Sequence, residues 1–482
     1  MNKIFEFRAR CLKPVLTKEI IKVSCSGKEL SEGECEIFDF GNHFVGYLTI
    51  KMTSVGSPQD APAFIKFKFC EREEELNEST ENYHGWISRS WIQEEYVHVD
   101  KLPCTLSLPR RYAFRYVAVE VLGLSSKYRL KITDAKLTAV TSAPETIMPV
   151  GKTEKEQAID KIALRTLREC MQYEFEDGSK RDRRLWLGDL RLQALANYQT
   201  FRHNDLVKRC LYLFAATADK KGRISACVFT EPRIRADDTF MFDYSLLFIP
   251  TLYDYFDATG DYETAKELLP IALQQLKLAD EQFIGDIVRD SDALGWCFLD
   301  WNLALNKQSG AQAVYLYCLR SAIMLSRMLG EKTESLEELY NRRKDAAISV
   351  FYDKERGLFT SGDGKQISYA SNIWFCLAGV LDSSSCAELL ARLEKAKDAI
   401  KPVTPYMMHH YVQALTDCGE TTKARAIINT YWGGMAELGA DTFFELFNPD
   451  DPTESPYGSR IVNSYCHAWS CTPSYFLRKY FL

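Results

Sequence analysis

Apolar and polar residues alternate along the first 145 residues, which is the two-residue period of a half-buried β-strand. The clearest runs are VGYLTIKMTS (45–54), AFIKFKFCE (63–71), YVHVD (96–100) and FRYVAVEVLG (114–123), and short polar turns separate them. Several short strands in series are typical of an antiparallel sandwich. This part of the chain is therefore predicted to be an antiparallel β-sandwich domain.

The hydrophobic period becomes that of a helix from about residue 153. In EQAIDKIALRTLRECMQY (156–173) the apolar residues fall mostly on one helical face. Comparable segments follow at about 262–284, 311–329, 334–350, 384–398, 404–417 and 421–431. The intervening TSAPETIMPVG (141–151) has two prolines and no period, and is interpreted as a linker. The pattern predicts two domains, a β-sandwich over 1–145 and a helical domain over 146–482.

One junction between helices recurs along the helical part. In DATGDYETAKELL (257–269), RMLGEKTESLEEL (327–339) and TDCGETTKARAII (416–428) a helix ends at glycine, an acid follows, and threonine lies near the next helix start. Glycine suits the left-handed C-cap, and the acid and threonine suit a helix N-terminus. The repetition predicts stacked α-hairpins, which leaves both an α-solenoid and an α/α toroid open.

Composition excludes several classes of function. The net charge of −6 gives no electrostatic case for nucleic acid or for an anionic membrane. No stretch approaches the ~18 apolar residues of a membrane span, and the N-terminus lacks the apolar core of a signal peptide. The 15 cysteines are scattered without a CxxC pair, which favours a reducing, cytoplasmic location. The seven histidines form no metal-binding motif, and no P-loop or dinucleotide fingerprint occurs, so neither a metal nor a cofactor is expected.

Acids and aromatic residues cluster in segments between the predicted helices. The segments are DGSKRDRRLWLGD (177–189, the signature loop), RADDTFMFDY (235–244), GWCFLDW (295–301), GADTFFELFNPDDP (439–452) and NSYCHAWSCTPSYFL (463–477). Carboxylates beside flat apolar rings, without metal or nucleotide motifs, are the profile of a glycoside hydrolase, in which two acids flank the sugar bond.

Each cluster also admits a purely structural interpretation. The signature loop could be a solvated charged turn, although Trp186 and its leucine neighbours are interleaved with the charges. Asp237 or Asp238 could be a helix N-cap, and His467 could be an ordinary core histidine. Glu445 differs, because TFFELF leaves a single carboxylate in an apolar run, where it must be neutralised, paired or functional.

The signature loop resembles that of bacterial α-L-rhamnosidases of the six-hairpin, glycoside hydrolase family 78 type, in which an Asp opens, an Arg–acid–Arg follows and Trp–x–Gly–Asp closes. Further segments resemble the same family in the same order. They are FDFGNHFVGYLTIKM (38–52), RYAFRYVAVEVLG (111–123), FLDWNLALNK (298–307), QISYASNIWFCLAGVL (366–381), GADTFFE (439–445) and NSYCHAWSCTPSYFL (463–477). The resemblance covers nearly the whole chain. It implies a β-sandwich followed by an (α/α)6 barrel, and so the toroid rather than the solenoid.

The same resemblance implies hydrolysis of terminal α-L-rhamnose with inversion. By position, Asp182 matches the general acid and Glu445 the general base. The other matches are Asp177, Arg181 and Asp189 for binding the sugar hydroxyls, and Trp186, Asp243, Asp300, Trp301 and His467 for lining the pocket. The family commonly has Glu as the acid, one methylene longer than Asp182. The chain also lacks the additional β-domains often found around this core, which favours small intracellular rhamnosides over polysaccharides.

Two other functions remain open on the sequence. Arg181 and Arg183 could bind a carboxylate bidentately, as a related α/α-barrel hydrolase for a uronic-acid or another deoxy sugar would require. Asp in place of Glu at position 182 would fit a non-catalytic carbohydrate-binding member of the fold. The expected partner is a small sugar, without nucleic acid or membrane, and assembly into a homo-oligomer is left open.

Overall fold

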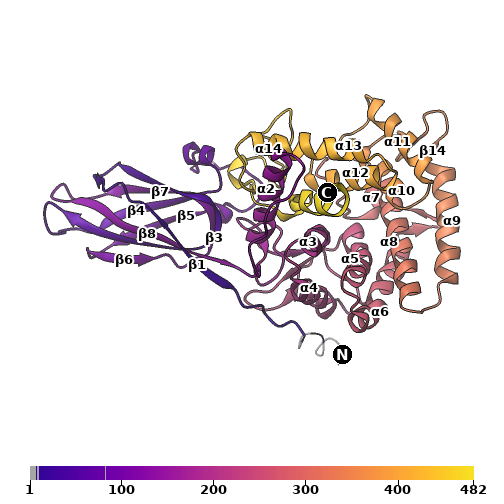
Figure 1. The fold of residues 1–482 in the computed structure, drawn as a ribbon, viewed down its shortest axis with the longest axis horizontal. Coiled ribbons are helices and arrows are strands. Elements are labelled where there is room, and N and C mark those ends of the chain that lie inside the picture. The colour runs from indigo at the N-terminus through magenta and orange to yellow at the C-terminus, as the bar shows by residue number, and fades with distance from the viewer. Residues whose placement is uncertain (1–6, 8–9, 82) are drawn as a thin grey trace.

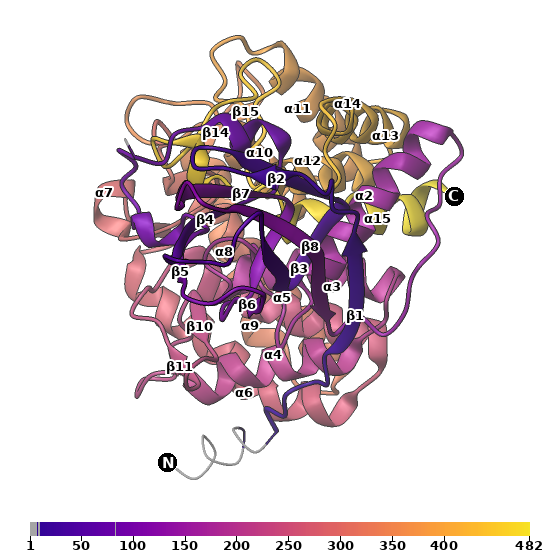
Figure 2. The same ribbon diagram turned by 90° about the vertical axis from the view of Figure 1, so that its left-hand side faces the viewer.

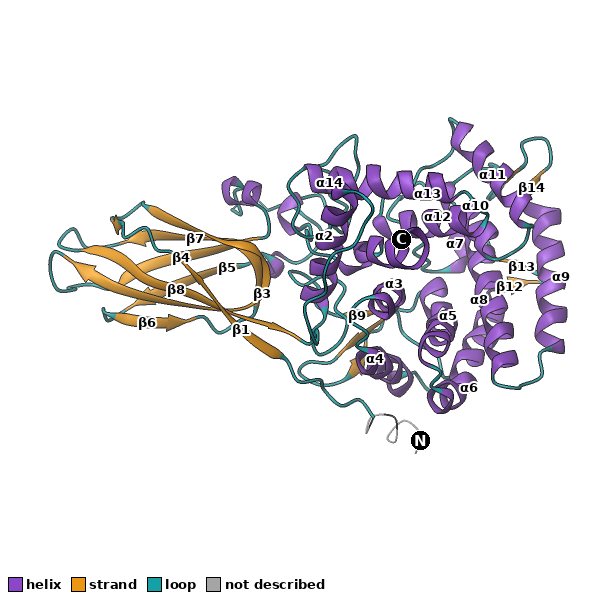
Figure 3. Cartoon of the chain, viewed as in Figure 1, coloured by secondary structure: helices purple, strands orange, loops and turns teal. Residues whose placement is uncertain are grey.

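The computed structural model describes residues 7, 10–81 and 83–482, and it consists of a β-domain followed by a helical domain (Figure 1). The long strands gather at one end of the molecule and the helices at the other, with a few short strands among the helices (Figure 3). The expected lack of a signal peptide rests partly on residues 1–6 and 8–9, which lie outside the described residues. Within the described chain, no helix combines the length and the apolar character that crossing a membrane requires.

The β-domain is an eight-stranded antiparallel sheet in the order β1-β8-β3-β7-β4-β5, with β2 paired to β8 and β6 to β3. Its strands are β1 Thr17–Val23, β2 Glu29–Leu30, β3 Cys35–Val55, β4 Ala63–Cys70, β5 Glu94–Val99, β6 Cys104–Ser107, β7 Tyr112–Gly123 and β8 Arg129–Thr141. The long strand β3 pairs with β7 over its first half and with β8 over its second. Inward-facing side chains, among them Phe38, Phe67 and Val119, form one apolar core. The alternation in the sequence therefore predicted the antiparallel β-domain correctly.

The helical domain closes into a ring. Its inner helices α3, α5, α8, α10 and α12 contact one another in that order, and the short helix η6 (Ala468–Cys471) contacts both α12 and α3. The helices are α2 Glu154–Cys170, α3 Leu187–Gln199, α4 Asn204–Thr217, α5 Phe242–Thr259, α6 Tyr262–Ala279, α7 Ser291–Leu294, α8 Gln308–Met328, α9 Glu334–Phe351, α10 Tyr369–Leu377, α11 Ser383–Lys395, α12 Pro405–Asp417, α13 Thr421–Ile427, α14 Gly433–Glu437 and α15 Pro473–Phe476. Because the ring closes, the α/α toroid is confirmed and the open solenoid is excluded.

The glycine–acid–threonine junction between α5 and α6 has the caps that the sequence predicted, whereas Thr333 and Glu420 at the starts of α9 and α13 make no side-chain cap. Gly260 ends α5 with φ +68°, in the left-handed region where glycine has no steric penalty. The Asp261 side chain then accepts a hydrogen bond from the backbone N–H of Thr264 at 3.1 Å and caps α6. Such tight joints return each outer helix antiparallel to its inner partner, and they place the longer inter-helix loops at the other end of the ring.

The β-domain lies against one end of the helical ring (Figure 2). Between β8 and α2 the chain has no regular secondary structure until Thr153 caps α2. The Thr141 hydroxyl contacts the backbone carbonyl groups of Arg168 and Met171 at 2.8 and 3.0 Å. The end of the sheet is thus held to the end of the first helix, and the signature loop follows directly.

Candidate active site

The signature loop connects α2 to α3 where the β-domain meets the helical ring (Figure 1). Asp177, Arg181 and Asp189 are only 4%, 4% and 2% exposed. A solvated charged turn would leave such side chains in water, so that interpretation of the loop is wrong. Buried charges are costly unless they are paired, which indicates that the loop is built around a polar site.

The loop has a strained turn at its middle. Asp182 and Arg183 lie at φ +62° and +51°, in the left-handed region that non-glycine residues seldom occupy. Hydrogen bonds hold this turn, because the Asp177 N–H donates to the Arg184 carbonyl at 2.9 Å and the Arg184 N–H donates to the Asp177 carboxylate at 3.0 Å. Strain of about 1–3 kcal/mol per residue persists where surrounding contacts over-determine it, and it concentrates at functional sites.

Arg181 lies between the two candidate catalytic acids. One guanidinium nitrogen donates to Glu445 Oε2, and another lies 3.8 Å from Asp182 Oδ1. Arg181 Nε also donates to the Val462 carbonyl at 3.0 Å, and its guanidinium stacks 4.1 Å from the centre of the Tyr457 ring. The Tyr457 hydroxyl donates to Glu445 Oε1. The lone carboxylate of the TFFELF run is thus paired, and both of its oxygens are oriented.

His467, Asp177 and Asp189 form a second polar group beside this pair. His467 Nε2 lies 3.8 Å from Asp177 Oδ2, and its Nδ1 lies 3.7 Å from Asp189 Oδ1. Burial and nearby carboxylates raise the pKa of both aspartates well above the ordinary value, and burial with a nearby guanidinium holds the pKa of His467 well below it. His467 Nδ1 and Asp189 Oδ1 have no hydrogen-bond partner among the described residues. The group can therefore exchange hydrogen bonds with hydroxyl groups of a ligand.

Two half-buried tryptophans add flat apolar surface. Trp186 packs edge-to-face on Tyr244 with ring centres 6.2 Å apart, and Trp301 packs on Tyr457 at 5.9 Å. Neither indole N–H finds a partner among the described residues. A buried indole usually has one, so these groups are further donors for a polar ligand.

Asp243 and Asp300 use their oxygens differently. Asp243 accepts hydrogen bonds from the backbone N–H groups of Phe298 and Leu299 at 3.0 Å. Asp300 accepts from the Thr404 hydroxyl at 2.6 Å. Protein donors engage both carboxylates, and this geometry fixes the segment that carries Trp301. The structure thus brings the signature loop, Glu445 and His467 together, and places these two aspartates as supports behind them.

Sequence reasoning missed a set of charges that the β-domain contributes. The Lys180 ammonium pairs with Glu75 and lies 3.7 Å from Glu71. Glu71 also accepts a hydrogen bond from the Tyr465 N–H at 2.7 Å and contacts His43 Nε2 at 3.1 Å. Burial alone would raise the pKa of Glu71, but the Lys180 ammonium and His43 hold it below its ordinary value. One carboxylate of the β-domain therefore holds both the signature loop and the C-terminal segment.

No local signal in the sequence could have identified these residues. Lys180 is separated from Glu75 by 105 positions, and the Tyr457 ring stacks on Arg181, which lies in the distant signature loop. Among the described residues, no cluster of histidine, cysteine, aspartate and glutamate could hold a metal ion.

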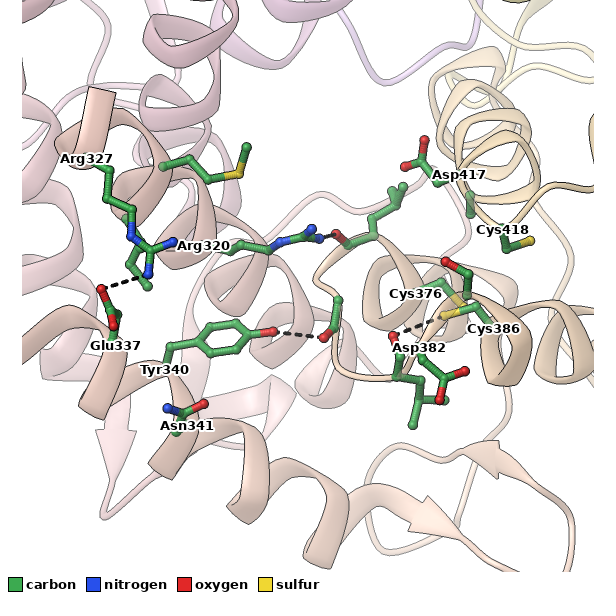
Figure 4. Close-up of a pocket in the computed structure, with 17 residues that line it drawn as sticks. Arg320, Arg327, Glu337, Tyr340, Asn341, Cys376, Asp382, Cys386, Asp417 and Cys418 are labelled. Carbon is green, nitrogen blue, oxygen red and sulfur yellow. Dashed lines mark hydrogen bonds and ion pairs between the residues drawn. The ribbon is translucent and has the colours of Figure 1, made fainter. Parts of the chain in front are cut away.

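A cavity of about 1,000 Å³, the distal cavity, lies between helices α8 to α12, away from these residues (Figure 4). Its arginines and its tyrosine have partners within the protein. Arg327 pairs with Glu337 at 2.9 Å, Arg320 donates to the Leu377 carbonyl at 3.2 Å, and Tyr340 donates to backbone carbonyls. The cavity is large, but these groups are already partnered, so it is not the candidate site.

Known families match both domains. Residues 12–139 match the glycosyl hydrolase family 78 alpha-rhamnosidase N-terminal domain, and residues 152–481 match the bacterial alpha-L-rhamnosidase 6 hairpin glycosidase domain. Among curated proteins, no sequence matches the chain significantly.

Solved rhamnosidase structures are similar to the chain. The rhamnosidase from Klebsiella oxytoca with rhamnose bound is 44% identical, with a TM-score of 0.95 over 100% of this chain and 99% of that one. The family 78 rhamnosidase of Bacillus sp. GL1 shares the fold at 21% identity and TM-score 0.78, over 98% of this chain and 48% of that one. The Streptomyces avermitilis alpha-L-rhamnosidase complexed with L-rhamnose also shares the fold, at 16% identity and TM-score 0.71, over 96% of this chain and 44% of that one. The chain thus spans about half the length of the latter two proteins.

Proposed function

The chain belongs to the bacterial α-L-rhamnosidases of glycoside hydrolase family 78, and we propose that it is an inverting exo-α-L-rhamnosidase that releases terminal L-rhamnose from small rhamnosides. The observation that carries the proposal is the placement of Asp182 and Glu445 on the two sides of one guanidinium, that of Arg181. Two carboxyl groups that flank one sugar bond are what glycoside hydrolysis requires.

In the proposed mechanism Asp182 protonates the glycosidic oxygen while Glu445 activates a water molecule on the opposite face of the sugar. Inverting enzymes separate the two carboxyl groups by about 6.5–9.5 Å to admit that water, and retaining enzymes by only about 5–5.5 Å. Arg181 contacts both acids, so the two carboxyl groups face one guanidinium. The Tyr457 hydroxyl and Arg181 fix the orientation of Glu445, which a base that aligns water needs.

Asp177, Asp189 and His467 are proposed to bind the rhamnose hydroxyls. Support comes from the raised pKa of both aspartates, since a protonated carboxyl can donate as well as accept a hydrogen bond. The indole N–H groups of Trp186 and Trp301 would add donors, and their rings would cover the apolar face of a deoxy sugar. Deep burial of this set favours a terminal sugar over an internal one.

Asp182 is one methylene shorter than the glutamate common at this position. We propose that the left-handed turn at Asp182 and Arg183 compensates by bringing the backbone closer to the leaving group. The alternative of a uronic-acid substrate loses its support, because Arg181 is engaged by Glu445 and Arg183 donates to the Arg111 carbonyl at 2.8 Å and to Gln93 at 3.1 Å.

A cytoplasmic location is also proposed. Cys170 and Cys466 remain free thiols although their sulfur atoms lie 4.0 Å apart in a buried setting. Such a pair is compatible with a reducing compartment.

The deciding experiment follows the hydrolysis of p-nitrophenyl α-L-rhamnoside by proton NMR from the first seconds. Inversion gives β-L-rhamnose as the first anomer, before mutarotation produces the α form. A first-formed α anomer would refute inversion. Failure to hydrolyse the rhamnoside, alongside other aryl glycosides, would instead favour the non-catalytic carbohydrate-binding alternative or another sugar.

A further inference from the structure

A cleft of about 460 Å³ opens where the β-domain meets the signature loop. Tyr47, Trp91 and Arg111 reach it from the β-domain, and Asp182 and Arg184 reach it from the loop. Its volume lies in the range of about 300–1,000 Å³ that small-molecule sites occupy. Apart from Asp182, the residues proposed to bind the sugar do not line this cleft. Binding of the sugar therefore does not account for it.

Asp182 lies on the wall between the buried polar group and this cleft. Its side chain is 22% exposed, whereas those of Arg181 and Glu445 are 5% exposed. A general acid must contact both the sugar and the oxygen of the leaving group. Since the sugar-binding groups lie on the buried side of Asp182, the leaving group belongs on its open side, which is the cleft.

Arg184 gives the cleft a charge without a partner. Its guanidinium carbon lies 4.3 Å from the ring centre of Phe229 and 6.0 Å from that of Trp91, both of which line the cleft. The guanidinium forms no salt bridge and no side-chain hydrogen bond with any described residue. Stacking on aromatic rings leaves the edge of a guanidinium, with its N–H donors, available to a carboxylate.

The other charged groups that line the cleft are engaged. Arg111 binds both oxygens of Glu176, at 2.7 and 2.8 Å. Glu231 pairs with Lys13 outside the cleft. Glu174 accepts a hydrogen bond from Thr230 and lies 3.5 Å from Arg209, and burial with the neighbouring Glu176 raises its pKa to about 7. Arg183, as described above, donates to a backbone carbonyl and a glutamine. Among the described residues that line the cleft, Arg184 is therefore the positively charged one whose guanidinium is available to bind a ligand.

We propose that this cleft is the aglycone-binding site, and that it selects a planar aromatic leaving group that carries a carboxylate. The aromatic ring stacks on Trp91, and the carboxylate binds the N–H edge of Arg184. The phenolic oxygen of the group then lies at Asp182, which protonates it as the bond to the sugar breaks. This inference rests on the proposed rhamnosidase activity and adds a specificity to it.

The test compares two substrates that differ only in charge, 4-carboxyphenyl and 4-carbamoylphenyl α-L-rhamnoside, in four variants. Arg184→Gln should raise KM for the carboxyphenyl substrate by about tenfold, as loss of a charge-assisted contact does, and change KM for the carbamoyl substrate by less than about twofold. Trp91→Ala should raise KM for both. The matched controls are Arg235→Gln, whose guanidinium also stacks on Phe229, at 4.1 Å, without lining the cleft, and Trp296→Ala, which is 53% exposed and does not line it. Both controls should leave KM unchanged.

Inhibition by free L-rhamnose separates this inference from the proposed function. The inhibition constant of rhamnose should be the same in all four variants and the wild type, because rhamnose occupies the buried side of Asp182. An equal change of KM for both substrates in Arg184→Gln, or no change in Trp91→Ala, would overturn the aglycone site while the rhamnosidase function stands. If the wild type hydrolyses no rhamnoside, the proposed function fails. In that case, binding of 4-hydroxybenzoate, followed by ligand-observed NMR, tests the aglycone site by itself. Loss of binding in Arg184→Gln supports the aglycone site, and equal binding in Arg184→Gln and Arg235→Gln overturns it.

Discussion

The candidate active site and the distal cavity differ in how their polar groups are satisfied. In the distal cavity, Arg327 pairs with Glu337, and Arg320 and Tyr340 donate to backbone carbonyls (Figure 4). At the active site, loops from separate parts of the chain meet, the backbone is strained at Asp182 and Arg183, and buried atoms of His467 and Asp189 find no hydrogen-bond partner in the described part of the chain. The distal cavity is the larger of the two hollows, at about 1,000 Å³ against 460 Å³ for the cleft beside Asp182.

The comparison shows that the size of a cavity says less about function than its unsatisfied polar groups. A packed helical wall can be polar and hollow while its arginine and tyrosine donors have found acceptors. Groups that remain unpaired in a buried place destabilise the fold, and they persist where a ligand uses them. Substitutions at the active site should therefore change activity, whereas substitutions in the distal cavity should leave it unchanged.

Glu445→Gln should have the largest effect. Loss of the base that activates water should lower kcat by about 10²–10⁴-fold for activated and unactivated aryl rhamnosides alike. Asp417→Asn removes a carboxylate from the distal cavity and should leave kcat unchanged. Steady-state kinetics on the two variants measures both effects. Azide should partly restore the activity of Glu445→Ala and give a glycosyl azide of inverted configuration. A similar loss of kcat in Asp417→Asn would contradict the claim that the distal cavity takes no part in catalysis.

Asp182→Asn should depend on the leaving group. Phenyl α-L-rhamnoside, which needs protonation, should lose about 10²-fold or more in kcat/KM, whereas 2,4-dinitrophenyl α-L-rhamnoside should lose less than about tenfold. The ratio of the two losses is the readout, and circular dichroism checks that the variant is folded. Equal losses for both substrates would refute the assignment of Asp182 as the acid.

Glu71→Gln should show that the β-domain is part of the active site. The substitution weakens the hold on Lys180 and Tyr465 and leaves a buried ammonium with one carboxylate fewer, which costs about 3 kcal/mol in comparable buried pairs. The melting temperature and kcat should therefore fall together. Glu34→Gln, which breaks the exposed pair with Lys28 on the same domain, is the control and should change neither. An unchanged kcat in Glu71→Gln would mean that the β-domain does not position the loops.

Asp189→Asn should stabilise the protein while it inactivates the enzyme. Burial raises the pKa of Asp189 in the folded state, so the unfolded state loses its proton at a lower pH than the folded state does. Stability from this group is present below the unfolded pKa of about 3.9 and is lost as the pH rises towards the folded value. Asparagine does not ionise, so the variant does not lose this stability as the pH rises. Its melting temperature should be higher than that of the wild type at pH 7 and the same at pH 4. A lower melting temperature at pH 7 would contradict the raised pKa.

Tyr340→Phe in the distal cavity should have the smallest effect and the opposite sign. Its hydroxyl donates to backbone carbonyls at the end of α10, and losing such a hydrogen bond costs about 1 kcal/mol. The variant should be slightly less stable in urea, with kcat and KM unchanged. If this substitution stabilised the protein, the Tyr340 hydroxyl would not be a satisfied, stabilising group, and the two sites would not differ in this respect.

Periodicity and turn chemistry in the sequence predicted much of the fold, because both are local. The runs over 45–54, 63–71, 96–100 and 114–123 lie in β3, β4, β5 and β7. Strand β1 was not singled out, since its side chains are mostly exposed at the edge of the sheet and the alternation is weak there. Closure of the helices into a ring is a long-range property, and only the family resemblance indicated it.

The candidate site was foreseeable where its residues share one motif. The signature loop holds its acids and arginines within 13 positions, so their proximity follows from the sequence. Asp243 and Asp300 were predicted to line the pocket because each carboxylate lies near aromatic residues in the sequence. The sequence pattern is the same whether the carboxylate binds a sugar or accepts hydrogen bonds from the protein, as both do here. Glu71 gave no signal, since its partners Lys180 and Tyr465 lie in distant segments.

Closure of the ring by the C-terminal segment has a consequence for synthesis of the protein. Gly178 and His467 form an isolated β-bridge, and the Asp177 carbonyl accepts a hydrogen bond from the Ala468 N–H at 2.8 Å. A nascent chain that has emerged from the ribosome as far as Asn463 can hold a folded β-domain and most of the helices, yet its signature loop still lacks this strand partner. Because domains fold as they emerge, hydrolytic activity is gained only after the segment around His467 has emerged and paired with the signature loop. Partly made chains would expose the charged loop to chaperones instead of to substrate.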